Sequence, residues 1–302
     1  MFLSRRTIDM ETLVLELLRE AAVRTVKPRV PDEIWQSLRR LEPSRKMRAR
    51  QKALAQRQAN AAAASPAGKK LRPLSERDLP SLARHFGTDK WGTHRYAQHY
   101  EHHFARFKRE RFSLLEIGIG GYSRDKQGGA SLRMWKAFFP KAQIIGLDIQ
   151  DKSFVVEPRI TVYRGSQTNE PLLRTIVSAA RNLKIVVDDG SHRPEHIRRT
   201  FEILFPLLPV GALYAIEDTQ TSYWPRWGGN LDLDEKSTTM GLVKRLIDGL
   251  NYEEWQDPDH RPSYVDRNIV GVHCYHNLVI IEKGPNIEGS NRGPNDRANP
   301  ST

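Results

Sequence analysis

The chain has 302 residues, of which 38% are hydrophobic and 28% charged, enough to bury one sizeable core with an extension outside it. No apolar run approaches the roughly 20 residues that a membrane helix needs, and the N-terminus lacks the apolar stretch of a secretory signal. The single cysteine, Cys274, excludes an intrachain disulfide and is typical of a reducing compartment, so we expect a cytoplasmic protein with no membrane partner.

The net charge of +12 is concentrated near the N-terminus, because residues 1–75 contain 17 Lys and Arg against 7 Asp and Glu. A basic segment suits nucleic acid or an anionic surface. However, no aromatic side chains interleave with the charges between Arg45 and Arg57, as a base-stacking surface would require. We therefore favour a solvated helical arm or an element for homo-oligomerisation over a nucleic-acid-binding arm.

Composition divides the chain into three segments. Residues 1–72 are expected to be a helical, basic extension that ends in a linker, with helices at 9–25 and 32–41. Residues 73–284 alternate strand and helix patterns and form the main domain. Residues 285–302 are rich in Pro, Asn, Gly and Ser, which predicts a disordered tail.

The main domain is predicted to be α/β, with a doubly wound, mostly parallel sheet. Short apolar, β-branched runs bounded by turn residues are typical of buried parallel strands. Right-handed crossovers bring the carboxyl ends of such strands to one edge, where open α/β folds bind ligands. The parallel strands are expected to begin at Phe112, Ala142, Ile160, Lys184 and Ala212. The helices are expected at 96–107, 131–139, 170–181, 193–208 and 238–250, and an antiparallel hairpin at 269–275 and 278–283.

A glycine-rich turn follows the first expected strand. It contains Gly118 and Gly120 and is preceded by Glu116, and Asp148 ends the next strand about 30 residues later. The dinucleotide pattern G-x-G-x-x-G fails here, and an acid directly before the turn suits a cationic ligand better than pyrophosphate. S-adenosylmethionine is such a ligand, since glycines admit its amino-acid end and Asp148 can accept both ribose hydroxyls. The alternative is a tight connection without a ligand.

Acidic side chains end two neighbouring strands of the expected sheet, Asp188 and Asp189 on one and Glu217 and Asp218 on the next. Three converging carboxylates repel one another unless a cation lies between them, and oxygen ligands select Mg²⁺, Mn²⁺ or Ca²⁺ over zinc. Neighbours on a strand point to opposite faces, so we expect only one of Asp188 and Asp189 to reach the ion. Helix caps or surface carboxylates are the alternative interpretation.

His192 lies in the turn after the first of these strands. A lone histidine is more often structural, but a metal lowers the pKa of a nearby hydroxyl and a neutral imidazole can take its proton. We therefore predict that His192 is the general base, with His196 as its rival. Tyr223, Trp224 and Trp227 either line an acceptor pocket, where aromatic faces pack on sugar rings, or support a loop.

Five sequence blocks follow one another at 115–122, 128–135, 146–149, 188–192 and 216–224. Together they resemble the macrocin and mycinamicin type of metal-dependent sugar O-methyltransferase, and the resemblance covers roughly residues 82–283. It implies a Rossmann-like class I methyltransferase fold with S-adenosylmethionine and Mg²⁺ as cofactors. The implied acceptor is a sugar hydroxyl of a glycosylated natural product or a saccharide.

By this resemblance, Asp189, Glu217 and Asp218 bind the metal, and His192 is the proton acceptor. The resemblance also places these residues around the cofactor: Thr88, Glu116, Gly118, Gly120, Ser131, Asp148, Ser166, Gln167 and Asp189. Some members of the family form tetramers, which implies a homo-oligomer. Residues 1–75 do not match the long auxiliary domain that we associate with such enzymes.

Two other functions are compatible with the sequence. The first is a nucleic-acid or nucleotide methyltransferase that the basic arm recruits to its substrate. If it is correct, the chain should bind RNA in a salt-dependent way, and deleting residues 1–75 should abolish the binding. No Asn-Pro-Pro-Tyr-type motif of amino methylation is present, which disfavours methylation of a base. A non-catalytic scaffold that binds S-adenosylmethionine predicts cofactor binding without transfer to any glycoside.

Overall fold

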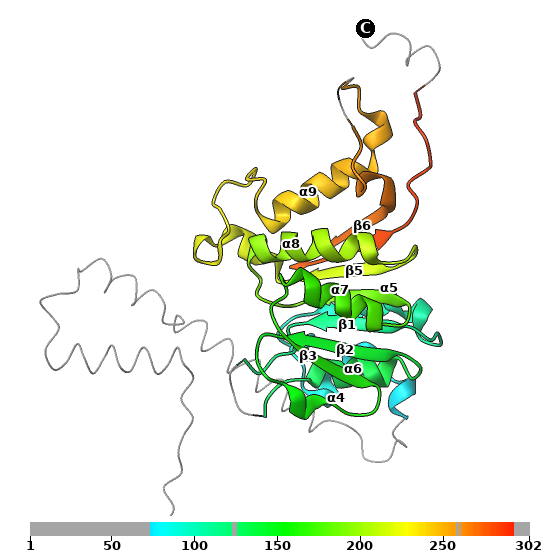
Figure 1. The fold of residues 1–302 in the computed structure, drawn as a ribbon, viewed down its shortest axis with the longest axis vertical. Coiled ribbons are helices and arrows are strands. Elements are labelled where there is room, and N and C mark those ends of the chain that lie inside the picture. The colour runs from blue at the N-terminus through cyan, green and yellow to red at the C-terminus, as the bar shows by residue number, and fades with distance from the viewer. Residues whose placement is uncertain (1–72, 123–125, 258, 260, 293–302) are drawn as a thin grey trace, which may run out of the picture. The chain divides into compact units, whose positions relative to one another are not determined.

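Figure 1 shows the computed structural model, which describes residues 73–122, 126–257, 259 and 261–292. The helices predicted within residues 1–72 lie outside the described residues, as do residues 293–302 of the predicted tail. The described chain forms a seven-stranded sheet with helices on both of its faces.

The strand order is β3-β2-β1-β4-β5-β7-β6. The first five strands in this order are parallel, whereas β7 pairs antiparallel with both β5 and β6. The strands are β1 (Ser113–Ile117), β2 (Gln143–Asp148), β3 (Ile160–Arg164), β4 (Leu183–Asp188), β5 (Leu213–Glu217), β6 (Ile269–Tyr275) and β7 (Leu278–Lys283). The predicted doubly wound, mostly parallel sheet with a C-terminal antiparallel hairpin is confirmed.

Helices cover both faces of this sheet. Their bounds are α4 (Leu79–Phe86), α5 (Tyr96–Phe104), α6 (Ala130–Phe138), α7 (Glu170–Ala179), α8 (Pro194–Leu204) and α9 (Thr239–Leu250). No helix was expected at α4, although both of its ends carry local signals. Asp78 caps the first turn by accepting the Ser81 N–H, and Gly87 ends the helix with φ of 72°.

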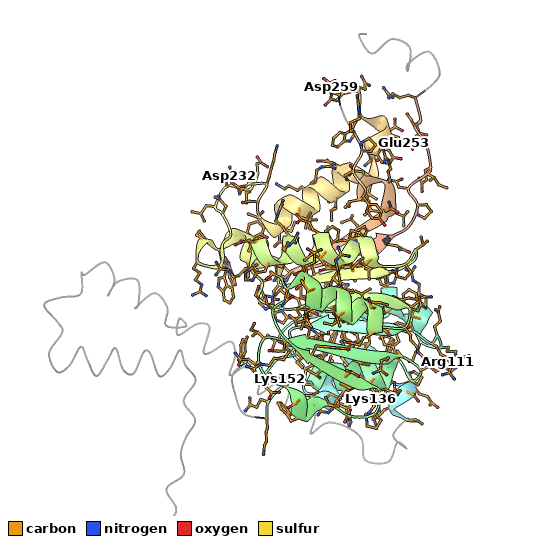
Figure 2. The ribbon with its side chains drawn as sticks, viewed as in Figure 1. Arg111, Lys136, Lys152, Asp232, Glu253 and Asp259 are labelled. Atoms are coloured by element: carbon orange, nitrogen blue, oxygen red, sulfur yellow. The ribbon has the colours of Figure 1, made fainter. Side chains whose placement is uncertain are left out.

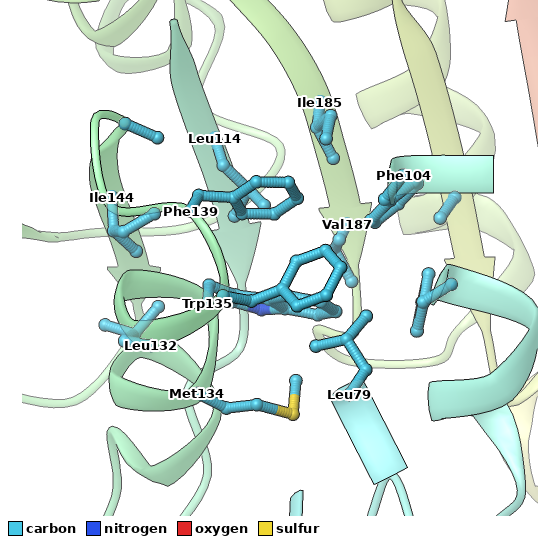
Figure 3. Close-up of a cluster of buried hydrophobic side chains, with 14 of the residues drawn as sticks. Leu79, Phe104, Leu114, Leu132, Met134, Trp135, Phe139, Ile144, Ile185 and Val187 are labelled. Carbon is cyan, nitrogen blue, oxygen red and sulfur yellow. The ribbon is translucent and has the colours of Figure 1, made fainter. Parts of the chain in front are cut away.

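Each strand contributes alternate side chains to two apolar clusters, one on each face. Leu114 and Ile185 pack with α4, α5 and α6, whereas Leu115 and Val186 pack with α7, α8 and α9. Figure 3 shows the first cluster, where Trp135 of α6 lies fully buried against the sheet. Burial on both faces explains why the strands are apolar at nearly every position, and it leaves polar side chains at their ends.

None of the helices in the described part of the chain is long and apolar enough to span a membrane.

The described part of the predicted tail is hydrogen-bonded to the domain. The Asn286 amide donates to the carbonyls of Leu250 and Asp266, and the Ser290 hydroxyl donates to Glu254. The boundary predicted after residue 284 is thus followed by residues that are still attached to the domain. The two predicted boundaries between the three segments stay predictions.

Candidate active site

The carboxyl ends of the five parallel strands meet at one edge of the sheet, and four of them carry acids. Glu116 is the penultimate residue of β1, and Asp148, Asp188 and Glu217 are the last residues of β2, β4 and β5. Because these strands are parallel, the acids lie at the same edge, as the sequence predicted.

A buried lysine that was not predicted lies among these carboxylates. Lys90 is 1% exposed, and it belongs to the loop between α4 and α5. Its Nζ lies 2.9 Å from Asp189 Oδ2, 2.7 Å from Glu217 Oε1 and 3.0 Å from Glu116 Oε1. Glu116 Oε1 accepts no aligned hydrogen bond, so its contact is an ion pair only. Burial lowers the pKa of Lys90, but the carboxylates outweigh burial and raise that pKa well above its ordinary value.

Two tyrosines of α5 reach the acids at the end of β5. The Tyr100 hydroxyl donates to Glu217 Oε1 at 2.6 Å, and the Tyr96 hydroxyl donates to Asp218 Oδ1 at 2.7 Å. A spacing of four residues places both rings on one face of the helix. Burial and the neighbouring carboxylates raise the pKa of both phenols, so both remain hydrogen-bond donors.

Among the described residues, Asp189, His192 and Asp218 form the one group that could hold a metal ion. A ligand atom from each lies within 4.8 Å of the others, and all three side chains are partly exposed, so a ligand can reach them. The carboxylate oxygens of Asp189 and Asp218 fit a hard divalent ion such as Mg²⁺ or Mn²⁺, and the imidazole of His192 lies beside them. Glu217 is not a member of this group, and its Oε1 accepts hydrogen bonds from Lys90 and Tyr100. Its predicted role as a metal ligand stays a prediction.

His192 and Asp218 face each other from two strained turns. His192 Nε2 lies 3.8 Å from Asp218 Oδ2, and both residues have φ of 55°, in the left-handed region. Such conformations cost about 1–3 kcal/mol each and cluster at functional sites. The rival base, His196, is engaged elsewhere, since its Nδ1 lies 2.9 Å from the Ser191 hydroxyl. The geometry therefore favours His192 over His196 beside the metal-binding group.

Aromatic side chains follow β5 in two short 3-10 turns, Thr219–Tyr223 and Pro225–Trp227. Tyr223 and Trp224 are each 42% exposed, so both rings present part of their surface to solvent. The ring of Trp227 lies 6.3 Å from the ring of His192. An aromatic surface is thus available beside the predicted base.

Asp188 points away from the edge, as strand alternation predicted. It is 1% exposed, and it accepts hydrogen bonds from the Gln167 amide at 3.1 Å and the Tyr214 hydroxyl at 3.2 Å. Burial raises the pKa of Asp188 to about 7, although the bonds from Tyr214 and Gln167 oppose this shift. Only Asp189 of the pair therefore reaches the metal-binding group.

Gln167, a predicted cofactor residue, uses its side chain to hold the turn that carries His192. Its Oε1 accepts the Ser191 N–H at 2.7 Å, and its Nε2 donates to Asp188 and Thr200. Its predicted contact with the cofactor stays a prediction.

The backbone of the glycine-rich turn lies close to the end of β4 at Gly118, whereas Gly120 borders open space. A Cβ on Gly118 would lie 2.0 Å from the Asp189 carbonyl oxygen, whereas a Cβ on Gly120 would meet nothing within 4 Å. Lys152, labelled in Figure 2, is 1% exposed. It donates to the backbone carbonyls of Tyr122 and Gln127. The open space at Gly120 fits a ligand that approaches the backbone.

The other predicted cofactor residues come from several elements, and their polar atoms largely have partners within the protein. Asp148 accepts the backbone N–H groups of Ile119 and Gln150. Glu116 is fully buried, and its Oε2 accepts the indole N–H of Trp135 at 3.1 Å. The remaining three positions are in the loop after α4, the first turn of α6 and the loop after β3, namely Thr88, Ser131 and Ser166. Contacts of all these residues with S-adenosylmethionine stay predictions.

About 70% of the chain is similar to known O-methyltransferases. No protein-family model matches the chain. Mycinamicin VI 2''-O-methyltransferase from Micromonospora griseorubida is 48% identical over 215 residues, which are 70% of this chain and 54% of that protein. Demethylmacrocin O-methyltransferase from Streptomyces fradiae is 47% identical over 215 residues, with the same two shares. The solved structure of MycE methyltransferase in complex with Mg and SAH matches with a TM-score of 0.68 and 47% identity, over 70% of this chain and 56% of that chain.

The fold is the Rossmann-like α/β fold of the MycE methyltransferase structure. Over its matched residues, the domain is related to the sugar O-methyltransferases of macrolide and tetracenomycin biosynthesis, and the resemblance predicted from five sequence blocks is confirmed. The chain spans about half the length of the curated relatives it matches.

Proposed function

We propose that the chain is an S-adenosylmethionine- and Mg²⁺-dependent O-methyltransferase that acts on a sugar hydroxyl of a glycosylated natural product or a saccharide. The convergence of Asp189, His192 and Asp218 at the edge that also carries the glycine-rich turn is the observation that carries the proposal. Its relatives support the acceptor class, since they are sugar O-methyltransferases at 43–48% identity.

His192 is the residue that accepts the proton of the acceptor hydroxyl, at Nε2. A sugar hydroxyl is a weak nucleophile until its proton leaves, and a neutral imidazole can take it. Asp218 Oδ2, 3.8 Å from that nitrogen, stabilises the imidazolium that results. Asp189 and Asp218 would hold Mg²⁺, with Glu217 as a further ligand, and the bound ion lowers the pKa of a hydroxyl.

The glycine-rich turn and Asp148 would hold S-adenosylmethionine, which supplies an electrophilic methyl group when bound. Gly120 leaves space for its amino-acid end, and Asp148 retains lone pairs for the ribose hydroxyls. Tyr223, Trp224 and Trp227 would pack on the sugar ring and orient its hydroxyl toward His192. Positioning and exclusion of water then contribute most of the acceleration.

The direct test incubates the full chain with labelled S-adenosylmethionine, Mg²⁺ and a panel of rhamnosides, deoxyhexosides, amino-sugar glycosides and mannose oligosaccharides. We expect one glycoside class to gain a methyl group, EDTA to abolish transfer and Mg²⁺ to restore it. Transfer that persists after thorough chelation contradicts the metal role. Binding of the cofactor without transfer to any glycoside supports the scaffold alternative, and transfer to RNA supports the nucleic-acid alternative.

A further inference from the structure

Lys90 lies where the predicted cofactor turn and the predicted metal site meet. Its ammonium contacts Glu116, Asp189 and Glu217, which lie at the ends of β1, β4 and β5, three adjacent strands of the sheet. Its backbone is also fixed, because the Lys90 carbonyl accepts the Ala97 N–H at the start of α5. One cation therefore bridges three neighbouring strand ends.

The acids around Lys90 outnumber it. Three carboxylates surround one ammonium, and Asp218 adds a fourth beside His192. Acids at this spacing in a poorly solvated site repel one another unless cations compensate them. A single divalent ion would compensate most of the negative charge that Lys90 leaves unbalanced.

The hydrogen bonds of Lys90 leave room for such an ion. Lys90 donates to Oδ2 of Asp189 and to Oε1 of Glu217. Within the described residues, the second carboxylate oxygen of each accepts no hydrogen bond. One oxygen of each acid is thus fixed by the protein, and the other is available for a further ligand.

We propose that Lys90 is a positioning residue that serves as an internal counter-ion: it holds the strand-end carboxylates together without a divalent ion and thereby limits their affinity for that ion. The proposal rests on the proposed function, since it presupposes a metal at this edge. Without Lys90, the acids depend on the divalent ion alone for compensation. The ion then binds more tightly and contributes more to the stability of the fold.

The test measures Mn²⁺ affinity by electron paramagnetic resonance and melting temperature with and without Mn²⁺, on the full chain. Lys90→Met is compared with Lys283→Met as a matched control. Lys283 is also a buried lysine, 3% exposed, but it donates to the carbonyls of Phe205, Pro206 and Leu208. It ends β7 beside the start of β5, at the opposite end of that strand from Glu217.

We expect Lys90→Met to bind Mn²⁺ at least tenfold more tightly than the wild type and to gain more melting temperature from saturating Mn²⁺. Lys283→Met should be destabilised but keep the wild-type Mn²⁺ affinity. Unchanged or weaker Mn²⁺ binding by Lys90→Met overturns the proposal while the proposed function stands. Absence of Mn²⁺ binding by the wild type overturns both.

A second variant covers the case in which Lys90→Met does not fold. Glu116→Gln removes a carboxylate that touches Lys90 without being a predicted metal ligand. The lysine then compensates Asp189 and Glu217 more fully, so Mn²⁺ should bind severalfold more weakly. Mn²⁺ affinity equal to that of the wild type in Glu116→Gln overturns the proposal.

Discussion

His192 and Asp218 approach within 3.8 Å from two turns that both have φ of 55°. For a residue other than glycine, a left-handed conformation costs about 1–2 kcal/mol, and asparagine tolerates it best. Each of these two positions therefore needs both a side chain with the right chemistry and a residue that tolerates the left-handed backbone. Substitutions can test the two needs separately.

The substitutions His192→Asn and His192→Val test this separation. Asparagine adopts the left-handed conformation but cannot take a proton, so we expect unfolding free energy within about 1 kcal/mol of the wild type and transfer reduced about 10²–10⁴-fold. Valine, branched at Cβ, should lose a further 1–3 kcal/mol or so. Urea unfolding and the methyl-transfer assay provide the measurements. Near-normal transfer by His192→Asn would point to His196 as the base.

For single residues, the sequence predicted which acidic side chains lie near the site better than it predicted which way each of them points. Alternation along a strand predicts that only one of Asp188 and Asp189 reaches the ion, and Asp189 is the one that lies in the candidate metal-binding group. Lys90 was missed because its partners Asp189 and Glu217 lie 99 and 127 residues away in the chain. The orientation of Glu217 toward Lys90 depends on the packing of α5, which no local pattern reveals.

At the scale of elements, the glycine-rich turn is bound to β4 by a close backbone contact. Gly118→Ala would place a Cβ 2.0 Å from the Asp189 carbonyl oxygen at φ of 78°, so the turn or the strand end must move. We expect a loss of roughly 3 kcal/mol or more of unfolding free energy, from strain and overpacking together. The displaced strand end should also weaken Mn²⁺ binding.

Gly120→Ala is the matched control in the same turn. Its φ of 73° is similar, but a Cβ there meets nothing within 4 Å. Only the backbone term of about 1–2 kcal/mol should be lost. Equal losses for the two variants, measured by urea unfolding, would show that the contact between the turn and β4 does not constrain the fold.

Most elements could be predicted because each strand and helix carries its own local signal. The hairpin at Ile269–Tyr275 and Leu278–Lys283 was expected at these bounds from two apolar runs around His276 and Asn277. The helix α4 was missed although its cap at Asp78 and its terminal Gly87 were both present. Its Pro80 and its short length of 8 residues give little helical periodicity to detect.

At the scale of the molecule, α5 joins the β6–β7 hairpin through a histidine cluster that should make stability depend on pH. His103 Nε2 lies 2.8 Å from the Tyr275 hydroxyl, and its ring lies 4.4 Å from that of His273. Burial, with His273, His102 and Arg106, lowers the pKa of His103 from 6.5 to about 4. Between these two pH values, His103 is protonated in the unfolded chain but neutral in the folded chain. The free energy of unfolding therefore falls as pH drops from 6.5 toward 4.

His103→Gln should flatten this dependence. Glutamine can still bond to the Tyr275 hydroxyl but does not titrate. Because His103 is partly solvated, we discount the effect by about half and expect the wild type to lose about 1.5 kcal/mol more than the variant across this pH window. Urea unfolding of both proteins across the window measures the difference. Parallel losses would exclude His103 as the cause.

In the function proposed here, one edge of the sheet binds a divalent ion beside the cofactor. Anomalous scattering at the manganese edge, from crystals of the full chain grown with Mn²⁺ and S-adenosylhomocysteine, locates that ion directly. We predict one strong peak about 2.0–2.3 Å from carboxylate oxygens of both Asp189 and Asp218. A peak elsewhere, or no peak at saturating Mn²⁺, would contradict the claim.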